Sequence, residues 1–148
     1  MSAVERALLL NASCATALYF GALIYAFAGN PAAATSNANR ALRLSPFDPL
    51  AFLAHLALGT AAVQETRYDE AASHFAKAVQ ANPRFSTLYV FHAASLALAG
   101  RQEEAQPIVQ RLLDLEPGFR LRLLFEVGVA QAVADRLAEG GRMLGLPE

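Results

Sequence analysis

Residues 86–117, STLYVFHAASLALAGRQEEAQPIVQRLLDLEP, have the pattern of two amphipathic helices joined by a turn. The first helix carries large apolar side chains among alanines and stops before Gly100, which suits the left-handed conformation that ends many helices. Glu103 and Glu104 fall in the first turn of the second helix, where the helix dipole favours carboxylates, and Pro117 closes the segment. Neither helix can bury its apolar side alone, so the pair has to pack against a similar unit.

The same pattern recurs upstream of two earlier prolines. Pro46, Pro83 and Pro117 are separated by 37 and 34 residues, and each has small or apolar residues 5, 8 and 12 positions before it. These residues are Leu112, Val109 and Ala105, then Ala78, Phe75 and Ala71, then Ala41, Ala38 and Ala34. Ala12, Ala7 and Val4 continue the register one period earlier. A period near 34 residues made of helix, turn and helix predicts a solenoid.

The pattern resembles the tetratricopeptide repeat, in which small residues let two helices approach, a bulky residue locks them and proline ends the second helix. The residues that match are Leu58, Gly59, Tyr25, Ala71, Phe75, Ala78 and Pro83, with Gly29 and Gly100 at the turns. Leu18, His55 and Tyr89 occupy a column where tryptophan is common in the family. The resemblance implies an all-α, right-handed α-α superhelix, and we expect C-terminal capping helices after it.

The register divides the chain into expected units that together form one domain. Residues 1–12 are predicted to be the second helix of a truncated repeat, ending near Asn11, and residues 13–48, 49–85 and 86–117 to be three repeats. Residues 118–148 are predicted to form capping helices, the last from about Ala132 to Met143. Because an array that opens with a second helix lacks its covering partner, we expect the chain to be the C-terminal piece of a longer protein.

Local signals place the helix boundaries of the earlier repeats. Asn30 is a suitable N-cap and Pro31 suits a first helical position, and Asp48 followed by proline repeats this start signal. The 37-residue spacing has two explanations, either three extra residues at the N-terminal end of the helix that ends near Gln64 or a longer turn at residues 65–67.

Composition narrows the function classes. The chain has 148 residues, 55% of them hydrophobic and 17% charged, with a formal net charge of −1. Nucleic acid and anionic membranes attract a basic face, which this balance does not supply, so nucleic-acid binding is not expected. The single cysteine, Cys14, cannot form an internal disulfide and favours a reducing, cytoplasmic location, with a small packing role for its side chain.

Residues 14–28, CATALYFGALIYAFA, are the one candidate for a membrane segment. The stretch is shorter than the ~20 residues needed to cross a bilayer, and it falls in register with the repeat. We therefore interpret it as a buried first helix and expect no membrane partner.

Catalytic chemistry requires titratable groups that converge, and the sequence spreads them apart. His55, His74 and His92 fall in three different helices, and no metal-ligand spacing, cysteine pair or phosphate loop occurs. Packing histidines are favoured over a metal site. We expect neither a catalytic residue, a metal nor a cofactor in this segment, although an upstream domain could be catalytic.

With catalysis not expected, the remaining function for this segment is the binding of a protein or peptide. In the resembled family the first helices of successive repeats line a concave groove, and here those columns are apolar and hold none of the cationic residues that grip chaperone carboxylates. The expected partner-binding groove consists of Tyr19, Leu23, Phe27, Leu53, Leu56, Val63, Val90 and Leu98. An exposed apolar groove needs a cover. Three alternatives remain for what covers the groove: the chain's own tail, a second copy in a homodimer, or an amphipathic helix of another protein.

Two functions follow. The first is a scaffold or adaptor that binds a protein or peptide in this groove. The second is a regulatory or dimerising tail, because residues 115–148 resemble the C-terminal regions of bacterial signalling proteins such as class III adenylate cyclase-like proteins and winged-helix regulators. A third class, a small-molecule sensor, would bind hydrophobic compounds in the groove.

Overall fold

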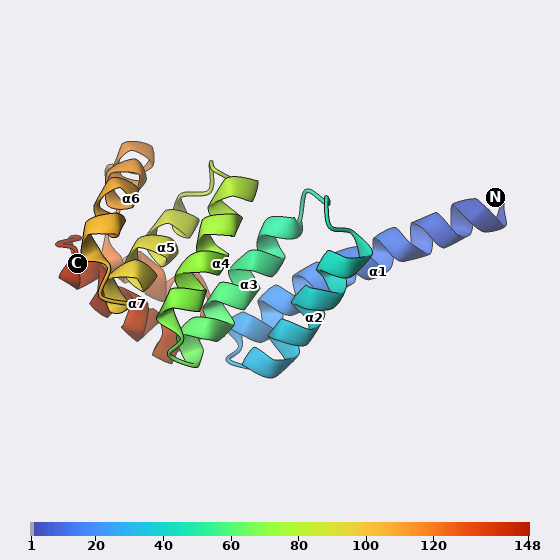
Figure 1. Cartoon of the computed structure of the whole chain (residues 1–148), viewed down its shortest axis with the longest axis horizontal. Coiled ribbons are helices and arrows are strands. Elements are labelled where there is room, and N and C mark those ends of the chain that lie inside the picture. Colours follow the sequence, from blue (N-terminus) through green and yellow to red (C-terminus); the bar gives the residue numbers. More distant parts are fainter. Residues whose placement is uncertain (1) are drawn as a thin grey trace.

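Three helical hairpins stack side by side along the chain (Figure 1). The structure, a computed structural model, describes residues 2–148, except for the side chains at positions 4, 5, 7–9 and 11–13. The hairpins are α1 (Ala3–Phe27) with α2 (Pro31–Leu44), α3 (Ala51–Gln64) with α4 (Tyr68–Ala81), and α5 (Ser86–Leu98) with α6 (Gln102–Leu115). A 3₁₀ helix, η1 (Leu121–Phe125), and α7 (Gln131–Met143) complete the described elements, none of which is a strand. The predicted all-α solenoid is confirmed.

The positions that defined the repeat are the positions where the hairpins pack. Every residue at the three offsets before the three prolines is buried, from Ala34, Ala38 and Ala41 in α2 to Ala105, Val109 and Leu112 in α6. Gly59 packs so closely against Phe75 that an added Cβ atom would lie 2.4 Å from the ring of that phenylalanine. The small residue and the bulky residue of the α3–α4 hairpin therefore lock the two helices together, as the family resemblance implied.

The turns within the three hairpins share one hydrogen-bonding pattern. At the end of each first helix, a backbone N–H donates a hydrogen bond to the carbonyl oxygen five residues earlier. The donor and acceptor are Asn30 and Tyr25, Arg67 and Ala62, and Arg101 and Leu96. The residue before each donor has a positive φ angle, which is 84° at Gly29, 80° at Gly100 and 59° at Thr66. This is the Schellman ending, in which the left-handed residue lets the chain reverse.

The starts of α2 and α3 follow the predicted capping signals at Asn30 and Asp48. The Asn30 side chain accepts a hydrogen bond from the backbone N–H of Ala33, and Pro31 is the first residue of α2. The Asp48 side chain accepts from the backbone N–H of Leu50, so it orders the approach to α3, which begins at Ala51. Of the three extra residues in the 37-residue spacing, two lie in the loop before α3, where residues 45–50 compare with residues 82–85 before α5, and one lies in α3, which has 14 residues against 13 in α5. The prediction that all three lengthen the helix is therefore wrong for two of them, and the turn at residues 65–67 is as long as the other two.

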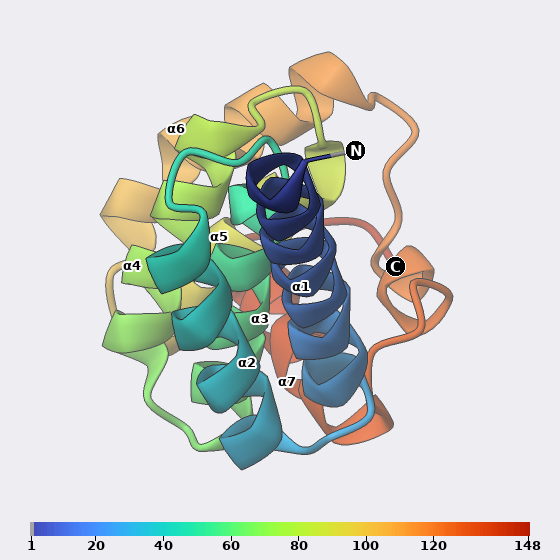
Figure 2. The same ribbon diagram turned by 90° about the vertical axis from the view of Figure 1, so that its right-hand side faces the viewer.

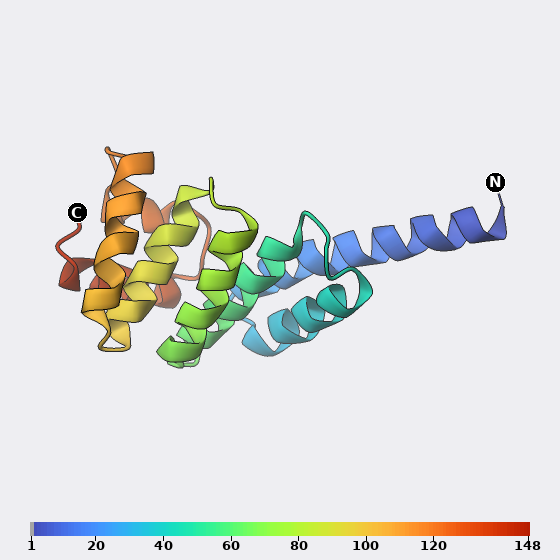
Figure 3. The ribbon, with the colours of Figure 1, turned by 45° about the horizontal axis from the view of Figure 1, so that its top comes forward.

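The first helix differs from the prediction. Residues 3–27 form one continuous helix, so the predicted end of a short helix near Asn11 is wrong. Nothing at that point forces an end, because neither glycine nor proline occurs between residues 3 and 20. The repeat matches at Val4, Ala7 and Ala12 lie outside the described side chains. The N-terminal half of α1 projects beyond the stacked hairpins (Figures 1 and 3).

The C-terminal segment turns back across the stack. The first of the predicted capping helices is the short 3₁₀ helix η1, which ends before Gly128 with its φ angle of 91°. The chain then enters α7, whose bounds match the predicted last helix within one residue. Figure 2, viewed along α1, shows α7 behind α3 and near the end of α1.

Candidate protein-interaction surface

The inner helices α3 and α5 are apolar on almost every side. Eleven of the 14 residues of α3 are buried, whereas α4 and α6 bury one face each and present polar residues on the other. A helix that is apolar all round has to be covered all round. The second helices of the hairpins cover one side of α3 and α5, and α7 covers another.

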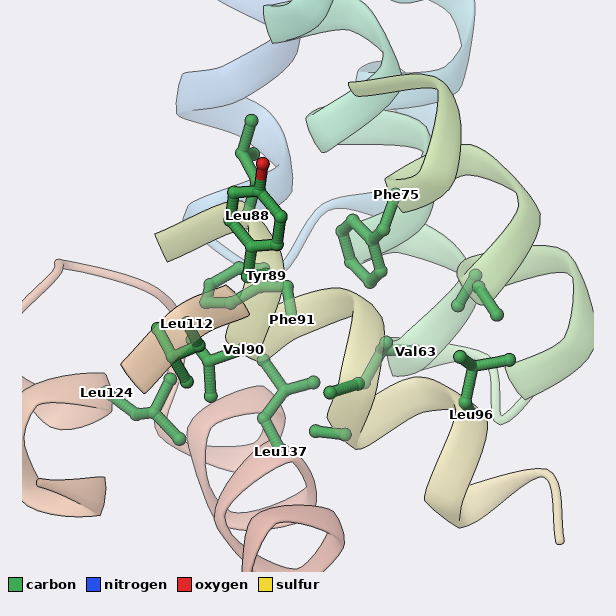
Figure 4. Close-up of a cluster of buried hydrophobic side chains, with 14 of the residues drawn as sticks. Val63, Phe75, Leu88, Tyr89, Val90, Phe91, Leu96, Leu112, Leu124 and Leu137 are labelled. Carbon is green, nitrogen blue, oxygen red and sulfur yellow. The ribbon is translucent and has the colours of Figure 1, made fainter. Parts of the chain in front are cut away.

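The helix α7 occupies the concave face that the sequence predicted to be a groove. It packs on α5 and α3, and its residues Val133, Ala134, Leu137 and Ala138 are buried. Leu137 belongs to the same cluster as Val63 of α3 and Val90 of α5 (Figure 4). Of the three covers that the sequence left open, the chain's own tail therefore fills the groove over α3 and α5.

Two contacts fix the position of α7. Gly140 lies against the backbone of α5, where an added Cβ atom would be 2.5 Å from the Ala94 carbonyl oxygen. The Arg136 guanidinium donates to the carbonyl oxygens of Val63 and Gln64, at 2.9 and 2.7 Å. These carbonyls belong to the last turn of α3, where acceptors lack partners within the helix and where a cation meets the negative end of the dipole.

Three of the eight predicted groove residues lie beneath this cover. Leu56, Val63 and Val90 are buried in the cluster that includes α7, and Leu53 is buried in the cluster formed by the first three helices. Leu98, at the end of α5, is half-buried. Leu56, Val63 and Val90 can reach a partner protein only where α7 leaves its place.

Tyr19 is a core residue. Its ring is fully buried between α1 and its neighbours, and its hydroxyl donates to the Ser45 carbonyl oxygen at 2.6 Å. Burial raises the pKa of the Tyr19 hydroxyl, and the nearby Asp48 carboxylate adds to the effect. Because the hydroxyl ties α1 to the end of α2, Tyr19 holds the first hairpin together instead of lining an open groove.

The open part of the inner face lies on α1. Leu23 and Phe27 are half-buried and line a hollow of about 320 Å³ together with Ile24, Ala28 and Gly128. Phe20 and Ile24 beside them are 47% and 65% exposed. The sequence analysis missed these two residues. The absence of any charged residue from position 7 to position 39 was the available signal.

A second hollow, of about 310 Å³, lies between the start of α5 and η1. Its floor is apolar, with Val90, Phe119 and Leu124, and Glu116 and Glu126 are on its wall. The Ser86 hydroxyl already donates to the Glu116 carboxylate at 2.8 Å. This hollow is formed by the tail itself and is separate from the open face of α1.

The three histidines are half-buried in separate helices. Burial, aided by the nearby Lys77 ammonium, lowers the pKa values of His55 and His74. Burial and the Arg101 guanidinium lower the pKa of His92 to about 4. Among the residues that the structure describes, no group of three or more His, Cys, Asp or Glu side chains is arranged to hold a metal ion.

Within the described residues, no helix combines the length and the apolar character needed to span a bilayer.

The fold and its buried repeat positions agree with a comparison to known families. The tetratricopeptide repeat model matches residues 21–86 and 56–118, so the matches together cover most of the chain. The chain belongs to the tetratricopeptide repeat family. No curated protein matches the chain. The family match ends at residue 118, so the resemblance of the tail to bacterial signalling proteins stays a prediction.

Proposed function

We propose that this chain is an adaptor that binds an amphipathic helix of another protein on its apolar inner face. Tetratricopeptide repeats generally mediate protein–protein interaction, and the chain shares the family's helical architecture. The observation that carries the finer proposal is the placement of α7. An amphipathic helix already lies across α3 and α5, so the inner face has the shape and chemistry that accept such a ligand.

The open stretch of this face on α1 is the proposed point of entry. Leu23 and Phe27 line a hollow there, and Phe20 and Ile24 extend the apolar surface along the helix. No charged side chain interrupts α1 between residues 7 and 27. The contacting side of the partner is therefore expected to be apolar, since a charged group placed there would be desolvated without a counter-ion.

The covered stretch is a second binding region in this proposal. Leu56, Val63 and Val90 become available to a partner helix when it displaces α7, whereas Leu53 stays buried among the first three helices. A partner that competes with α7 has to offer comparable apolar contacts and an equivalent of the Arg136 hydrogen bonds at the end of α3.

Photo-crosslinking in cells tests the proposal. A photoreactive phenylalanine analogue at Ile24 should give a discrete protein adduct, and the same group at Gln80, an exposed position on α4, should not. The masses of the adducts identify what was captured. Equal adducts at both positions, or none at Ile24, would rule out the α1 face as a protein-binding surface.

A further inference from the structure

A hollow of about 320 Å³ lies on the side of α5 that faces away from α7. The helices α4 and α6 each pack on α5 and form the walls of this hollow (Figure 1). Tyr89 and His92 line it from α5, whereas Val90 and Ala94 lie on the side of α5 that packs toward α7. Because successive residues of a helix are about 100° apart, these two pairs point in roughly opposite directions. We call the space the α4–α6 hollow.

Most of the lining of the α4–α6 hollow is apolar. A hydrogen bond of 2.8 Å from the Tyr89 hydroxyl to the Pro83 carbonyl oxygen fixes the buried aromatic ring on α5. The volume lies near the lower end of the range for ligand pockets, ~300–1,000 Å³, so the hollow suits a small body such as an aromatic ring. The other apolar lining residues are Ala76 and Val79 of α4 and Pro107 and Ile108 of α6.

Each of the three helices adds one side chain with a hydrogen-bond donor to this lining. Gln80 comes from α4, His92 from α5 and Arg111 from α6. Within the part of the chain that the structure describes, none of these three side chains makes a hydrogen bond or an ion pair. Asp114, one turn after Arg111, instead accepts a hydrogen bond from Gln110 at 3.0 Å. Three donors on one apolar hollow therefore lack an acceptor that the chain itself supplies.

The charge of the hollow selects the kind of ligand. Of the residues that line this described hollow, Arg111 alone carries a full charge at neutral pH. Burial and the Arg101 guanidinium lower the pKa of His92 to about 4, so its imidazole is neutral there and donates from one nitrogen. A guanidinium can bind a carboxylate through two parallel hydrogen bonds, whereas a cationic ligand would be repelled.

We infer that the α4–α6 hollow binds a small aromatic carboxylic acid, with its ring between α4 and α6 and its carboxylate at Arg111. Gln80 and His92 donate to the same carboxylate. This site goes beyond the adaptor proposal, because it uses none of the inner-face residues. It also differs from the sensor expected from the sequence, which would bind hydrophobic compounds in the inner groove.

Calorimetric titration with cinnamate tests the inference. The uncharged cinnamamide has the same ring and should bind about tenfold more weakly, because it cannot form the ion pair. Arg111→Met should weaken the binding of cinnamate by a similar factor, and Arg40→Met, which removes another exposed arginine from α2, should not. Equal affinities for the two compounds, equal affinities of the two variants, or no binding of cinnamate at millimolar concentration would overturn the inference.

A C-terminal phenylalanine of a peptide offers the same chemistry as a free aromatic acid. An acetylated dipeptide that ends in phenylalanine should therefore be titrated beside cinnamate. We expect it to bind more weakly, because the added peptide group has to fit the same small volume. Tighter binding of the dipeptide would make a peptide terminus the ligand and overturn the assignment of a free acid.

Filling the hollow tests whether the ring of the probe enters it. Ala76 is half-buried in the wall, so Ala76→Leu should abolish the binding of cinnamate while Arg111 and the helicity of the chain are retained. Ala32→Leu, at an exposed position on α2, is the matched control and should bind as the wild-type chain does. Undiminished binding by Ala76→Leu would place the probe outside the hollow.

The three histidines locate the probe without any substitution. Cinnamate should shift the imidazole NMR resonances of His92, whereas those of His55 and His74, which do not line the hollow, should stay in place. Equal shifts at all three histidines, or none at His92, would contradict the site. This readout is independent of the crosslink at Ile24, so either proposal can fail while the other holds.

Discussion

The three hairpin turns differ at one residue, and that residue shows how much of the backbone geometry depends on glycine. Gly29 and Gly100 adopt the left-handed conformation in two turns, and Thr66 adopts it in the third. A β-branched side chain in this region is unfavourable by roughly 1–2 kcal/mol, because its Cβ atom crowds the following carbonyl. The hydrogen bonds of the turn hold Thr66 there, since they are the same as in the other two turns.

We expect Thr66→Gly to raise the free energy of unfolding by about 0.5–1 kcal/mol. The substitution relieves the left-handed strain, and the greater freedom of glycine in the unfolded chain offsets part of the gain. Urea titration measures the change. The reciprocal control is Gly100→Thr, where an added Cβ atom meets no atom within 4 Å, so that any loss reports the backbone conformation alone. A destabilised Thr66→Gly variant would contradict the argument.

At the contact between Gly59 and Phe75 we expect a substitution of glycine to lower stability. Gly59→Ala should lower the free energy of unfolding by about 1–3 kcal/mol, because the added methyl group would sit within 2.4–2.8 Å of three ring atoms of Phe75 and the two helices would have to separate. Gly118→Ala is the control, since it lies in open space. Thermal unfolding of the two variants should differ clearly. Equal melting temperatures would mean that the ring moves aside freely.

At the scale of the element, α7 shows how the chain covers its own inner face. Arg136 and Arg142 lie on the same helix, and both are hydrogen-bonded. Arg136 donates to carbonyl oxygens at the end of α3, whereas Arg142 pairs with Glu148 on the exposed surface. Exposed ion pairs contribute little to stability, but a charged donor to two carbonyl oxygens at a helix end contributes more, although the Val63 oxygen also accepts from the backbone N–H of Thr66.

Arg136→Met should therefore weaken the docking of α7, by about 1–2 kcal/mol, while keeping most of the apolar stem. Amide hydrogen exchange should quicken in α7 first. Arg142→Met is the matched control and should leave exchange in α7 nearly unchanged. Should the two variants behave alike, the Arg136 contacts would not be what holds α7 against α3.

The elements that could be predicted best were those whose ends are determined by residues close by in the sequence. The turns at Gly29 and Gly100, the start of α2 at Pro31 and the bounds of α7 follow from residues next to them in sequence. The length of α1 was missed because the repeat register suggested a break that no residue at Asn11 enforces. The loop before α3, which takes two of the three extra residues, was not predicted, because the spacing of the prolines does not say whether a helix, a turn or the loop between repeats contains them.

The candidate surface was harder to predict, because it depends on what covers it. Leu56, Val63 and Val90 were predicted to line a partner-binding groove, and a sequence does not show that they are buried in one cluster with α7. Tyr19 was assigned to the open groove, and its hydroxyl instead bonds a carbonyl 26 residues away. Phe20 and Ile24 became visible as exposed residues only once the packing of α1 was known.

At the scale of the whole molecule, acid should destabilise the fold through its half-buried histidines. The pKa of His92 is lowered from its ordinary 6.5 to about 4, because burial and the Arg101 guanidinium disfavour its charged form. His92 also lines a hollow with Tyr89, Gln80 and Arg111, and Arg111 is a second cation there. The pKa values of His55 and His74 are lowered for the same main reason, burial.

The sign follows from proton binding. Between pH 6.5 and about 4 the unfolded chain holds more protons on His92 than the folded chain does, so the free energy of unfolding should fall as the pH falls through that window and should be level above it. The exposed carboxylates of Glu104 and Glu148, whose pKa values are lowered by hydrogen bonds from Arg101 and Arg142, lose their contribution to stability only below their ordinary pKa of 4.5.

Urea titrations at several pH values separate the two windows. His92→Gln should reduce the fall in stability between pH 6.5 and 4, leaving the part that comes from His55 and His74 and the decline below 4.5 in place. If the variant and the wild-type chain lose stability in parallel across the upper window, His92 is not the group that is protonated on unfolding.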